Sequence, residues 1–326
     1  MTSPITWDDV LAARARIAPY LAPTPLRHYP VLDAATGARV LVKHENHLPT
    51  NAFKARNAMS FMTALPADQR SRGVIAATRG NHGAGLAWAG ARLGVPVVIC
   101  VPHGNNPEKN AAIQGHGAEL VISGRDYDEA VEVALRLRTE RGLVMAHSTN
   151  DANVIAGAAT LSAELCEQAA ATEEKLDAIV VAIGGGSQAV GAIVATRHLR
   201  SPVQVFGVQA AGASAIHDSW HARQRLTTDS ATTFADGLAT RSTYDLTWPT
   251  LLDGLAGFVT VTEAELASAV RLMIEATHNL AEGAGAAGLA GLVALGDRLA
   301  GKTVAVILSG SNIDRPTLRT IFGSAA

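Results

Sequence analysis

Short apolar runs alternate with alanine-rich segments of helical spacing along most of this chain. Apolar runs with few polar breaks are typical of strands buried on both faces, and helices between such strands are typical of parallel sheets. The pattern therefore predicts an α/β fold built on open, mainly parallel sheets. The predicted strands are residues 40–45, 73–78, 95–101, 118–123, 177–184, 203–209 and 302–310.

Two helix starts carry a capping-box pattern, and one long segment carries no clear period. Thr262 with Glu265 predicts a helix over 262–279, and Thr6 with Asp9 predicts the first helix of the chain. Residues 217–249 match neither a helical nor a strand period, so we expect irregular structure near the surface or near a site.

Composition excludes several classes of protein. The 27 basic and 29 acidic residues nearly cancel, which argues against a nucleic-acid partner. Apolar runs are too short to cross a bilayer, and the N-terminal residues lack an export-signal pattern, so we expect no membrane partner and a cytoplasmic location. The two cysteines, Cys100 and Cys166, are too few for a disulfide framework or a cysteine-rich zinc site, and we expect buried thiols.

Two nucleotide-binding patterns occur in the wrong context. Residues 296–303, GDRLAGKT, match the P-loop consensus, but a helix-like segment precedes them and a strand-like run follows, the reverse of what a P-loop needs. We expect Gly301 to end that preceding helix. The Gly-x-Gly-x-x-Ala match that starts at Gly184 lacks the acidic residue of a dinucleotide site, because Gln209 stands near the expected position.

Three segments rich in turn-forming residues each follow a predicted strand: 78–83, 184–188 and 309–312. Open α/β sheets bind ligands at the carboxyl ends of their strands, although glycine, serine and asparagine also serve simple turns. A glycine loop at a helix start presents backbone N–H groups that can hold a phosphate. A separate lysine, Lys54, becomes a candidate nucleophile if it faces such a loop, since a desolvated lysine is readily deprotonated.

Taken together and in order, these segments resemble one family. HENHLPTNAFKARNA, with Lys54, resembles the pattern E-x-x-x-P-T-G-S/A-F-K-x-R-G-A, and ATRGNHGAG resembles the asparagine loop S-x-G-N-H-A/G-Q-G. GGGSQ resembles a tetraglycine phosphate loop, and SGSN resembles a final S-G-x-N motif. The family is the fold type II (β-family, tryptophan synthase β-like) pyridoxal 5′-phosphate enzymes, and within it the serine/threonine dehydratases.

The resemblance implies a role for each matching residue. Lys54 would carry pyridoxal 5′-phosphate as a Schiff base and act as the catalytic base. The other expected cofactor-binding residues are Phe53, Asn81 (to the phenolic oxygen), Gly184, Gly185, Gly186, Ser187, Gln188 and Ser309 (to the pyridine nitrogen). The expected substrate-binding residues are Thr50, Asn51, Thr78, Arg79, Gly80 and His82.

The resemblance also implies the architecture and the reaction. Residues 1–47 and 149–326 would form a large cofactor-binding domain, residues 48–148 a small mobile domain, and the protein a homodimer. The expected reaction is β-elimination from a 3-hydroxy amino acid, L-threonine or L-serine by default, to a 2-oxo acid and ammonia, as in amino acid catabolism. The regulatory domain of the biosynthetic threonine dehydratases would be absent.

Departures from the family pattern keep a second substrate class open. Asn51 and Asn57 replace two family glycines, and Ser187 replaces the last glycine of the phosphate loop. Arg79 stands where serine racemases carry a serine; a guanidinium is a poor proton donor, which favours elimination over racemisation. Arg79 could pair with a substrate carboxylate, cover an aryl group or point into solvent. These residues favour, as the alternative, a bulkier substrate such as phenylserine, hydroxyaspartate or a hydroxyectoine-derived intermediate.

Two further alternatives remain. A β-synthase would add a nucleophile to the same intermediate, although His82 in the asparagine loop favours a dehydratase by analogy. A non-catalytic binder of the cofactor or of an amino acid is the other alternative, and the intact set of Lys54, Asn81 and Ser309 argues against it. We expect no metal, because Gln209 and Ala215 replace the cation ligands of some relatives.

Overall fold

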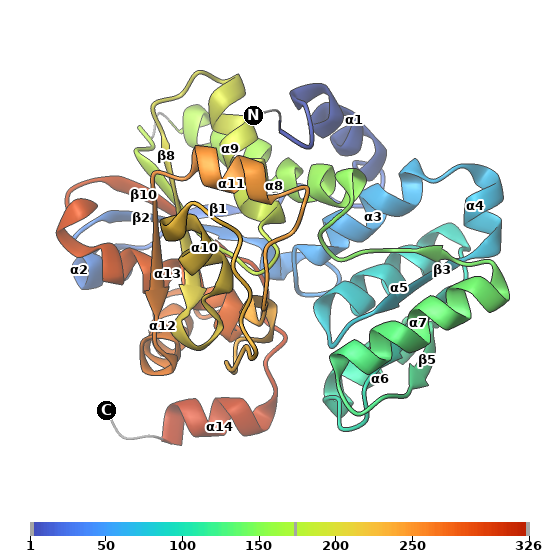
Figure 1. The fold of residues 1–326 in the computed structure, drawn as a ribbon. Helices are drawn as coiled ribbons and strands as arrows, with labels where there is room; N and C mark the ends of the chain where they lie inside the picture. Colours follow the sequence, from blue (N-terminus) through green and yellow to red (C-terminus); the bar gives the residue numbers. More distant parts are fainter. Residues whose placement is uncertain (1–2, 173–174, 324–326) are drawn as a thin grey trace.

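The computed structural model describes residues 3–172 and 175–323, and their strands form two separate sheets (Figure 1). In the larger sheet all neighbours are parallel except β1 and β2. Across it the order is β1 (Leu26–His28), β2 (Arg39–His44), β10 (Thr303–Leu308), β7 (Ala178–Ala182), β8 (Gln204–Ala210) and β9 (Gly257–Val261). The smaller sheet is wholly parallel, in the order β5 (Glu119–Ile122), β4 (Val97–Val101), β3 (Val74–Ala77) and β6 (Val144–Met145).

The predicted α/β class and all seven predicted strands are confirmed. Strands β1, β6 and β9 were not predicted from the sequence. Strands β1 and β6 span only three and two residues, which is too short to show a period. Strand β9 (Gly257–Val261) is partly exposed at the sheet edge, so it lacks the continuous apolar run of its neighbours.

Helices cover both faces of the larger sheet and fill two separate cores. Along β10, Val304 and Val306 face one core with α12 and α13, whereas Ala305 and Ile307 face the other with α8 and α9. This alternation explains why the strand reads as continuously apolar. The helices around this sheet are α1 (Trp7–Ile17), α2 (Pro30–Thr36), α8 (Ala152–Ala171), α9 (Ser187–His198), α10 (Ala215–Ala222), α11 (Trp248–Gly254), α12 (Glu263–Thr277), α13 (Gly283–Leu295) and α14 (Arg315–Gly323).

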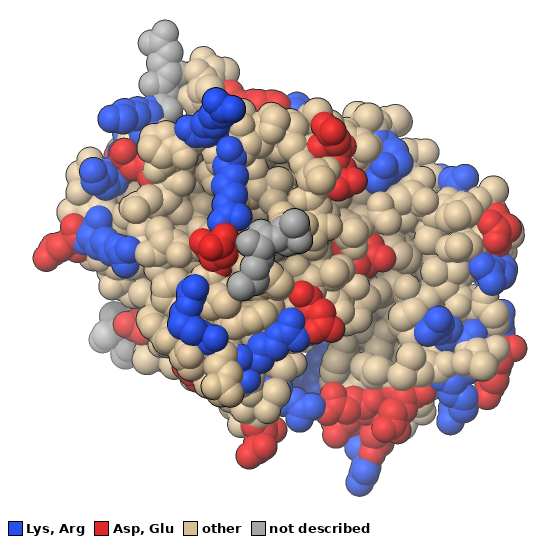
Figure 2. Space-filling view, turned by 45° about the horizontal axis from the view of Figure 1, so that its top comes forward, with Lys and Arg blue, Asp and Glu red and all other residues tan. Residues whose placement is uncertain are grey.

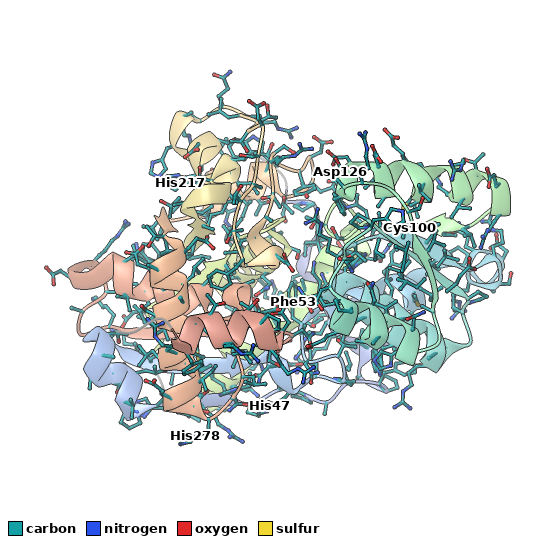
Figure 3. The ribbon with its side chains drawn as sticks, turned by 90° about the horizontal axis from the view of Figure 1, so that it is seen from below. His47, Phe53, Cys100, Asp126, His217 and His278 are labelled. Carbon is teal, nitrogen blue, oxygen red and sulfur yellow. The ribbon has the colours of Figure 1, made fainter. Side chains whose placement is uncertain are left out.

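The smaller sheet has its own core and lies beside the larger one (Figure 1). We call this sheet with its helices the smaller lobe, and the rest of the described chain the larger lobe. Phe53 lies between the two lobes and Cys100 within the smaller one (Figure 3). Helix α3 packs against both α5 and α8 and so joins the lobes. Helices of the smaller lobe are α3 (Lys54–Ala64), α4 (Ala67–Arg72), α5 (Asn81–Leu93), α6 (Pro107–Gly115) and α7 (Tyr127–Arg141).

Both predicted capping boxes are present, at Thr6 and Thr262. The segment predicted to be irregular contains the end of α10 and the start of α11, and between them it is irregular apart from a 3-10 turn, Asp236–Leu238. The P-loop match indeed lies between a helix and a strand. However, helix α13 ends with Gly296 as its C-cap, so the expectation that Gly301 ends it was wrong.

The surface charges, the helices and the two cysteines can be compared with the predictions made from the composition. Lys/Arg and Asp/Glu side chains both occur over the face shown in Figure 2, and acidic side chains gather in one patch at its lower edge. Among the described residues, no helix is long and apolar enough to cross a membrane. Cys100 is buried but Cys166 only partly so; both thiols are free, and burial raises the pKa of each to about 11.

Candidate active site

A cavity of about 490 Å³ lies between the two lobes, and most of the predicted site residues line it. Phe53, Lys54, Thr78, Arg79, Gly80, Asn81, His82, Gly184, Gly185, Gly186, Ser187, Gln188 and Ser309 all contribute to its wall. Four segments that are far apart in the sequence therefore meet at one place.

Three neighbouring strands of the larger sheet deliver most of these side chains. Strands β2, β10 and β7 are adjacent and parallel, so their carboxyl ends meet at one edge of the sheet. Residues 45–54 follow β2, residues 309–312 follow β10 and residues 183–188 follow β7. The asparagine loop follows β3 of the smaller sheet and reaches the cavity from the opposite side.

The lysine segment and the final motif are tied together by backbone hydrogen bonds. The Phe53 N–H donates to the carbonyl of Ser309 at 2.9 Å, and Ala52 pairs with Gly310 as an isolated antiparallel bridge. One residue further on, the Ser311 N–H donates to the Asn51 carbonyl at 2.9 Å. These bonds place the start of α3 directly against the loop that carries Ser309.

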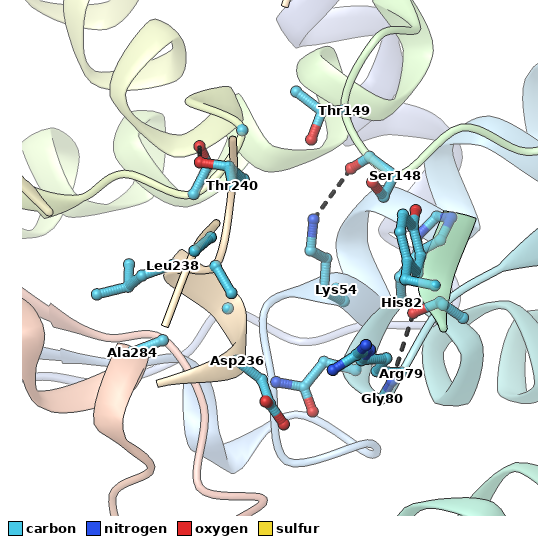
Figure 4. Close-up of a pocket in the computed structure, with 18 of the residues that line it drawn as sticks. Lys54, Arg79, Gly80, His82, Ser148, Thr149, Asp236, Leu238, Thr240 and Ala284 are labelled. Carbon is cyan, nitrogen blue, oxygen red and sulfur yellow. Dashed lines mark hydrogen bonds between the residues drawn. The ribbon is translucent and has the colours of Figure 1, made fainter. Parts of the chain in front are cut away.

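Lys54 is the first residue of α3, and its side chain extends into the cavity (Figure 4). Its Nζ donates to the Ser148 carbonyl at 3.0 Å and lies 4.9 Å from the centre of the Phe53 ring. Burial without an acidic partner lowers the pKa of Lys54 to about 8. Helix α5 packs closely here, since a Cβ on Gly85 would lie only 2.7 Å from the Lys54 carbonyl oxygen.

Asn81 opens α5, and both ends of its amide are hydrogen-bonded. Its Nδ2 donates to Glu282 Oε1 at 2.6 Å, and its Oδ1 accepts from Asn312 Nδ2 at 2.7 Å. Just before it, the Gly80 N–H donates to Thr78 Oγ1 at 3.3 Å (Figure 4), which closes the turn between β3 and α5.

His82 is buried beside Asn81 and is held in one tautomer. Its Nε2 lies 3.0 Å from the Ala146 carbonyl, which can only accept, so Nε2 carries the proton. Burial lowers the pKa of His82 to about 3, and the Nδ1 atom has no hydrogen-bond partner among the described residues. A neutral imidazole with a free acceptor nitrogen therefore adjoins the cavity.

The glycine loop leads into α9 without a side-chain cap, so backbone N–H groups at this helix start remain available. Gly185 allows a close approach, because a Cβ there would collide with Thr149 Oγ1. Ser187 and Gln188 form the first turn of the helix, and Gln188 Oε1 is buried without a partner among the described residues.

Ser309, from the loop after β10, is 3% exposed. Its hydroxyl lies 3.3 Å from the Ala284 carbonyl, a weak contact that leaves the hydroxyl free to turn toward the cavity. It supplies a neutral hydrogen-bonding group at the end of the cavity formed by β10 and α13.

Thr50 and Asn51 do not line the cavity. The Thr50 carbonyl accepts from Asn312 Nδ2 at 2.8 Å, and its side chain is buried. Asn51 is exposed and has a φ of 54°, a conformation that favours glycine and that asparagine tolerates. This backbone requirement accounts for asparagine at a family glycine position. A substrate-binding role for Thr50 and Asn51 stays a prediction without support from their placement.

Several residues that line the cavity were missed, among them Glu282, Lys109 and Asp236. Glu282 precedes a glycine-rich helix, where an acidic residue looks like an ordinary N-cap, but its side chain makes no cap bond. Burial raises the pKa of Glu282 to about 7, partly opposed by the charge of Lys109 and the hydrogen bond from Asn81. Only the fold brings this carboxyl to Asn81.

Gln209, which stands where some relatives carry a cation ligand, forms two hydrogen bonds within the protein. The Gln209 Nε2 donates to Thr240 Oγ1 at 3.1 Å, and its Oε1 accepts from the His217 N–H at 3.0 Å. Across the described ranges 3–172 and 175–323, no group of three or more histidine, cysteine or acidic side chains is placed to hold a metal ion.

Comparisons with known proteins agree with this geometry. The chain matches the family described as pyridoxal-phosphate dependent enzyme over residues 17–310. It is 34% identical over 310 residues to the L-threonine ammonia-lyase of Thermotoga maritima, covering 95% of this chain and 76% of that protein. It is 31% identical over 316 residues to the L-threo-3-hydroxyaspartate ammonia-lyase of Saccharomyces cerevisiae, covering 97% and 96% of the two chains.

Structural similarity extends over nearly the whole chain. The crystal structure of a threonine deaminase from T.th. matches with a TM-score of 0.90 at 35% identity, over 95% of this chain and 99% of that one. The four sequence motifs, their meeting in one cavity and these matches lead to one conclusion. The chain belongs to the family of pyridoxal-phosphate dependent enzymes and has the fold type II architecture of its threonine deaminase-like members.

Proposed function

We propose that this protein removes the β-hydroxyl of a small 3-hydroxy amino acid, by default L-threonine or L-serine, and releases a 2-oxo acid and ammonia. The observation that carries the proposal is the meeting of Lys54, Asn81, the glycine loop and Ser309 in one cavity. Relatives named as ammonia-lyases of threonine and of threo-3-hydroxyaspartate support it. The water lost in the elimination returns in the final hydrolysis, so the reaction needs no oxidant or reductant.

The residues of the cavity fit pyridoxal 5′-phosphate. The helix start at Ser187 offers uncapped N–H groups for a phosphate, and the missing side chain of Gly185 lets Thr149 pack directly against the loop. Asn81 Nδ2 can donate to a phenolic oxygen, and Ser309 can donate to a ring nitrogen. Lys54 would supply the amine that holds the cofactor. The bound cofactor supplies an electron sink for the charge that develops at the substrate α-carbon.

Lys54 is suited to move a proton at the α-carbon. Because burial lowers its pKa to about 8, about a tenth of the Lys54 amine is unprotonated at pH 7, far more than for a solvated lysine. A general base works best when its pKa lies near the working pH. The bond to the Ser148 carbonyl and the neighbouring Phe53 ring orient the amine.

The asparagine loop is suited to hold the substrate carboxylate. Thr78, Gly80 and His82 lie on the cavity wall opposite the glycine loop. The N-terminus of α5 favours an anion at this point, since its backbone N–H groups and helix dipole point there. We assign Thr78 and the adjacent N–H groups to the carboxylate, and His82 Nδ1 to a donor group of the substrate.

A substrate panel tests the proposal. Purified protein is incubated with L-threonine, L-serine and bulkier 3-hydroxy amino acids, and 2-oxo acid and ammonia are measured while the visible absorbance of the lysine-bound cofactor is followed. We expect an absorbance band that Lys54→Ala and Lys54→Arg both lose, and 2-oxo acid from at least one substrate. A band without 2-oxo acid from any substrate would contradict the proposal and favour a β-synthase, tested by adding a thiol nucleophile, or a binder.

A bulkier substrate is the second candidate, and Arg79 is the observation that favours it. Of Asn51, Asn57 and Arg79, only Arg79 lines the cavity, and it makes no hydrogen bond or ion pair with the described residues. An unpaired guanidinium there suits a second carboxylate or an aryl group. In the same panel, turnover of threonine and serine alone would exclude this candidate.

We also propose that the protein is a cytoplasmic homodimer whose residues 48–148 form a small mobile domain, with 1–47 and 149–326 as the large one. The resemblance to the dehydratases supports each point. Light scattering after size-exclusion chromatography tests the dimer, cell fractionation tests the location, and hydrogen exchange with and without substrate tests the mobility.

A further inference from the structure

Asn81 is the centre of a chain of side-chain hydrogen bonds that the proposed function does not use. Asn312 Nδ2 donates both to the Thr50 carbonyl, at 2.8 Å, and to Asn81 Oδ1, at 2.7 Å. Asn81 Nδ2 in turn donates to Glu282 Oε1 at 2.6 Å. The chain therefore runs from the lysine segment through the final motif to the asparagine loop, and ends on the residue before α13.

The direction of every hydrogen bond in this network follows from the contact between Asn312 and the Thr50 carbonyl. A backbone carbonyl only accepts, so the Asn312 atom that faces Thr50 must be the amide nitrogen. That same nitrogen faces Asn81, so the Asn81 atom opposite it must be the oxygen. The Asn81 nitrogen is then the atom that faces Glu282, and its second N–H has no acceptor among the described residues.

Glu282 is placed for this one contact. It is the N-cap residue of α13, but its side chain makes no cap bond and forms no ion pair with the described residues. Its only side-chain hydrogen bond in the described chain goes to Asn81, inside the cavity wall. The carboxyl therefore contacts Asn81 and not the backbone N–H groups of the helix that it precedes.

We propose that Asn312 and Glu282 are positioning residues that fix the Asn81 amide in one orientation, so that the free N–H of Nδ2 is presented to the cofactor ring. The inference rests on the proposed function, because it needs the cofactor beside Asn81. It gives the final S-G-x-N motif a second role besides Ser309, and it gives Thr50 a role through its backbone carbonyl instead of through substrate contact.

Two pairs of variants test whether Asn312 and Glu282 orient the Asn81 amide or only fill space around it. Asn312→Asp keeps the size of the side chain but removes both donated bonds, and Asn312→Ala removes the side chain. Glu282→Gln keeps an acceptor for Asn81 Nδ2, whereas Glu282→Leu removes it at similar volume. Asn105→Asp is the matched control, because Asn105 Nδ2 bonds only Asn110 Oδ1 and lies outside the cavity wall.

The readouts are the visible band of the cofactor in substrate-free holoenzyme, the separate kcat and KM values, and the melting temperature. We expect Asn312→Asp and Glu282→Leu to shift the band and to lower kcat about tenfold or more, the effect of one lost hydrogen bond in a buried site. Glu282→Gln and Asn105→Asp should keep the wild-type band and kcat within about threefold.

Three outcomes would overturn the inference. Wild-type bands and kcat in Asn312→Asp and Glu282→Leu would mean that Asn81 needs no positioning. If Glu282→Gln lowered kcat as much as Glu282→Leu, the carboxyl group itself would be required and not only an acceptor for Asn81. If every Asn312 and Glu282 variant lost kcat in step with its melting temperature, and none shifted the band, the two residues would have a purely structural role. A wild-type protein without the band or without 2-oxo acid would instead refute the proposed function.

Discussion

Asn57 is a polar residue at a buried position that offers its amide no hydrogen-bond partner among the described residues. It replaces a family glycine, is fully buried in α3, and neither its Oδ1 nor its Nδ2 has a hydrogen-bond partner among the described residues. A buried amide without partners costs free energy. The sequence motif showed that asparagine replaces a family glycine here, but only the packing of α3 shows that its amide makes no hydrogen bond with the described residues.

Asn57→Ala should therefore stabilise the protein or leave its stability unchanged, by about 0 to 1 kcal/mol, because no hydrogen bond is lost and alanine favours a helix. Ser60→Ala on the same helix is the control. Ser60 is equally buried, but its hydroxyl donates to the Asn153 carbonyl at 2.8 Å, so its loss should cost about 1 kcal/mol. Urea unfolding compares the two; a larger loss for Asn57→Ala would mean that the amide has a bound water as partner.

Lys54 gives a pH-dependent prediction at the same scale. Burial lowers its pKa from 10.5 to about 8, so below pH 8 most of the amine is protonated and cannot attack the cofactor aldehyde. The rate of cofactor attachment to the apoprotein should rise about tenfold per pH unit below pH 8 and level off above it. Stopped-flow absorbance measures this rate, and Lys54→Arg is the control. A rise that continues to pH 10 would mean that the amine is solvated like an ordinary lysine.

At the scale of elements, a buried cluster of charges holds α3 against α8 and β2. Arg56 donates to Glu45 at 2.7 Å and to Glu164 at 2.7 Å, and Lys43 donates to Glu164 at 3.0 Å. Burial alone would raise the pKa of Glu164, but Arg56 and Lys43 lower it below its ordinary value. Arg56 stands two residues after Lys54, so this cluster anchors the helix that begins with the proposed Schiff-base lysine.

Arg56→Leu should destabilise the protein by about 3–5 kcal/mol, because Glu45 and Glu164 would lose the cation that compensates their burial. Arg14→Ala is the control: Arg14 also pairs with α8, through Glu167 at 2.7 Å, but this pair is exposed and its loss should cost about 1 kcal/mol or less. Urea unfolding at pH 7 gives both values. Similar losses for the two variants would show that the buried cluster adds no more than a surface pair.

The same cluster predicts an acid sensitivity. A carboxyl whose pKa is lowered by folding stabilises the folded state above its ordinary pKa of 4.5, and this contribution is lost as the pH falls below that value. In Glu164→Gln the fall of unfolding free energy between pH 5 and pH 3 should be smaller than in the wild type, measured by urea unfolding. Glu167→Gln should leave that slope close to the wild-type slope.

At the scale of the whole molecule, two ion pairs join the lobes beside the cavity. Lys109 of α6 pairs with Asp236, and Asp128 of α7 pairs with Arg241. All four side chains line the cavity, and the larger-lobe partners come from the irregular segment between α10 and α11. The sequence of this segment showed no helical or strand period, yet the segment forms part of the cavity wall and contacts the glycine loop, where Thr240 Oγ1 donates to the Gly184 carbonyl at 3.3 Å.

Reversing one charge of the Asp128–Arg241 pair should weaken substrate binding, because the two lobes would lose one of their contacts beside the cavity. Since an exposed pair contributes about 1 kcal/mol or less, Arg241→Asp should raise KM by about fivefold at most. The double variant Arg241→Asp with Asp128→Arg should recover most of the loss at low salt. Steady-state kinetics at two ionic strengths measures both effects, and a double variant as poor as the single one would exclude the pairing as the cause.

What the sequence by itself determined is the class of the fold, seven of the strands and thirteen of the residues that line the cavity. These depend on local information: apolar runs mark strands buried on both faces, and glycine, asparagine and serine mark the turns after them. Because parallel strands end at one edge of a sheet, residues such as Gly184 and Ser309 could be assigned to a common site before any distance was known, and the family resemblance added Lys54 to that site.

The tertiary structure alone decided the partners of those residues. No motif in the sequence singled out Glu282, and it became the partner of Asn81 only because α13 and α5 meet across the cavity. Thr50 and Asn51 were expected at the substrate, but neither lines the cavity, and their backbone carbonyls accept hydrogen bonds from Asn312 and Ser311 in the loop after β10. Hydrogen bonds and desolvation depend on distances of a few ångströms between segments far apart in the chain, and no local pattern records those distances.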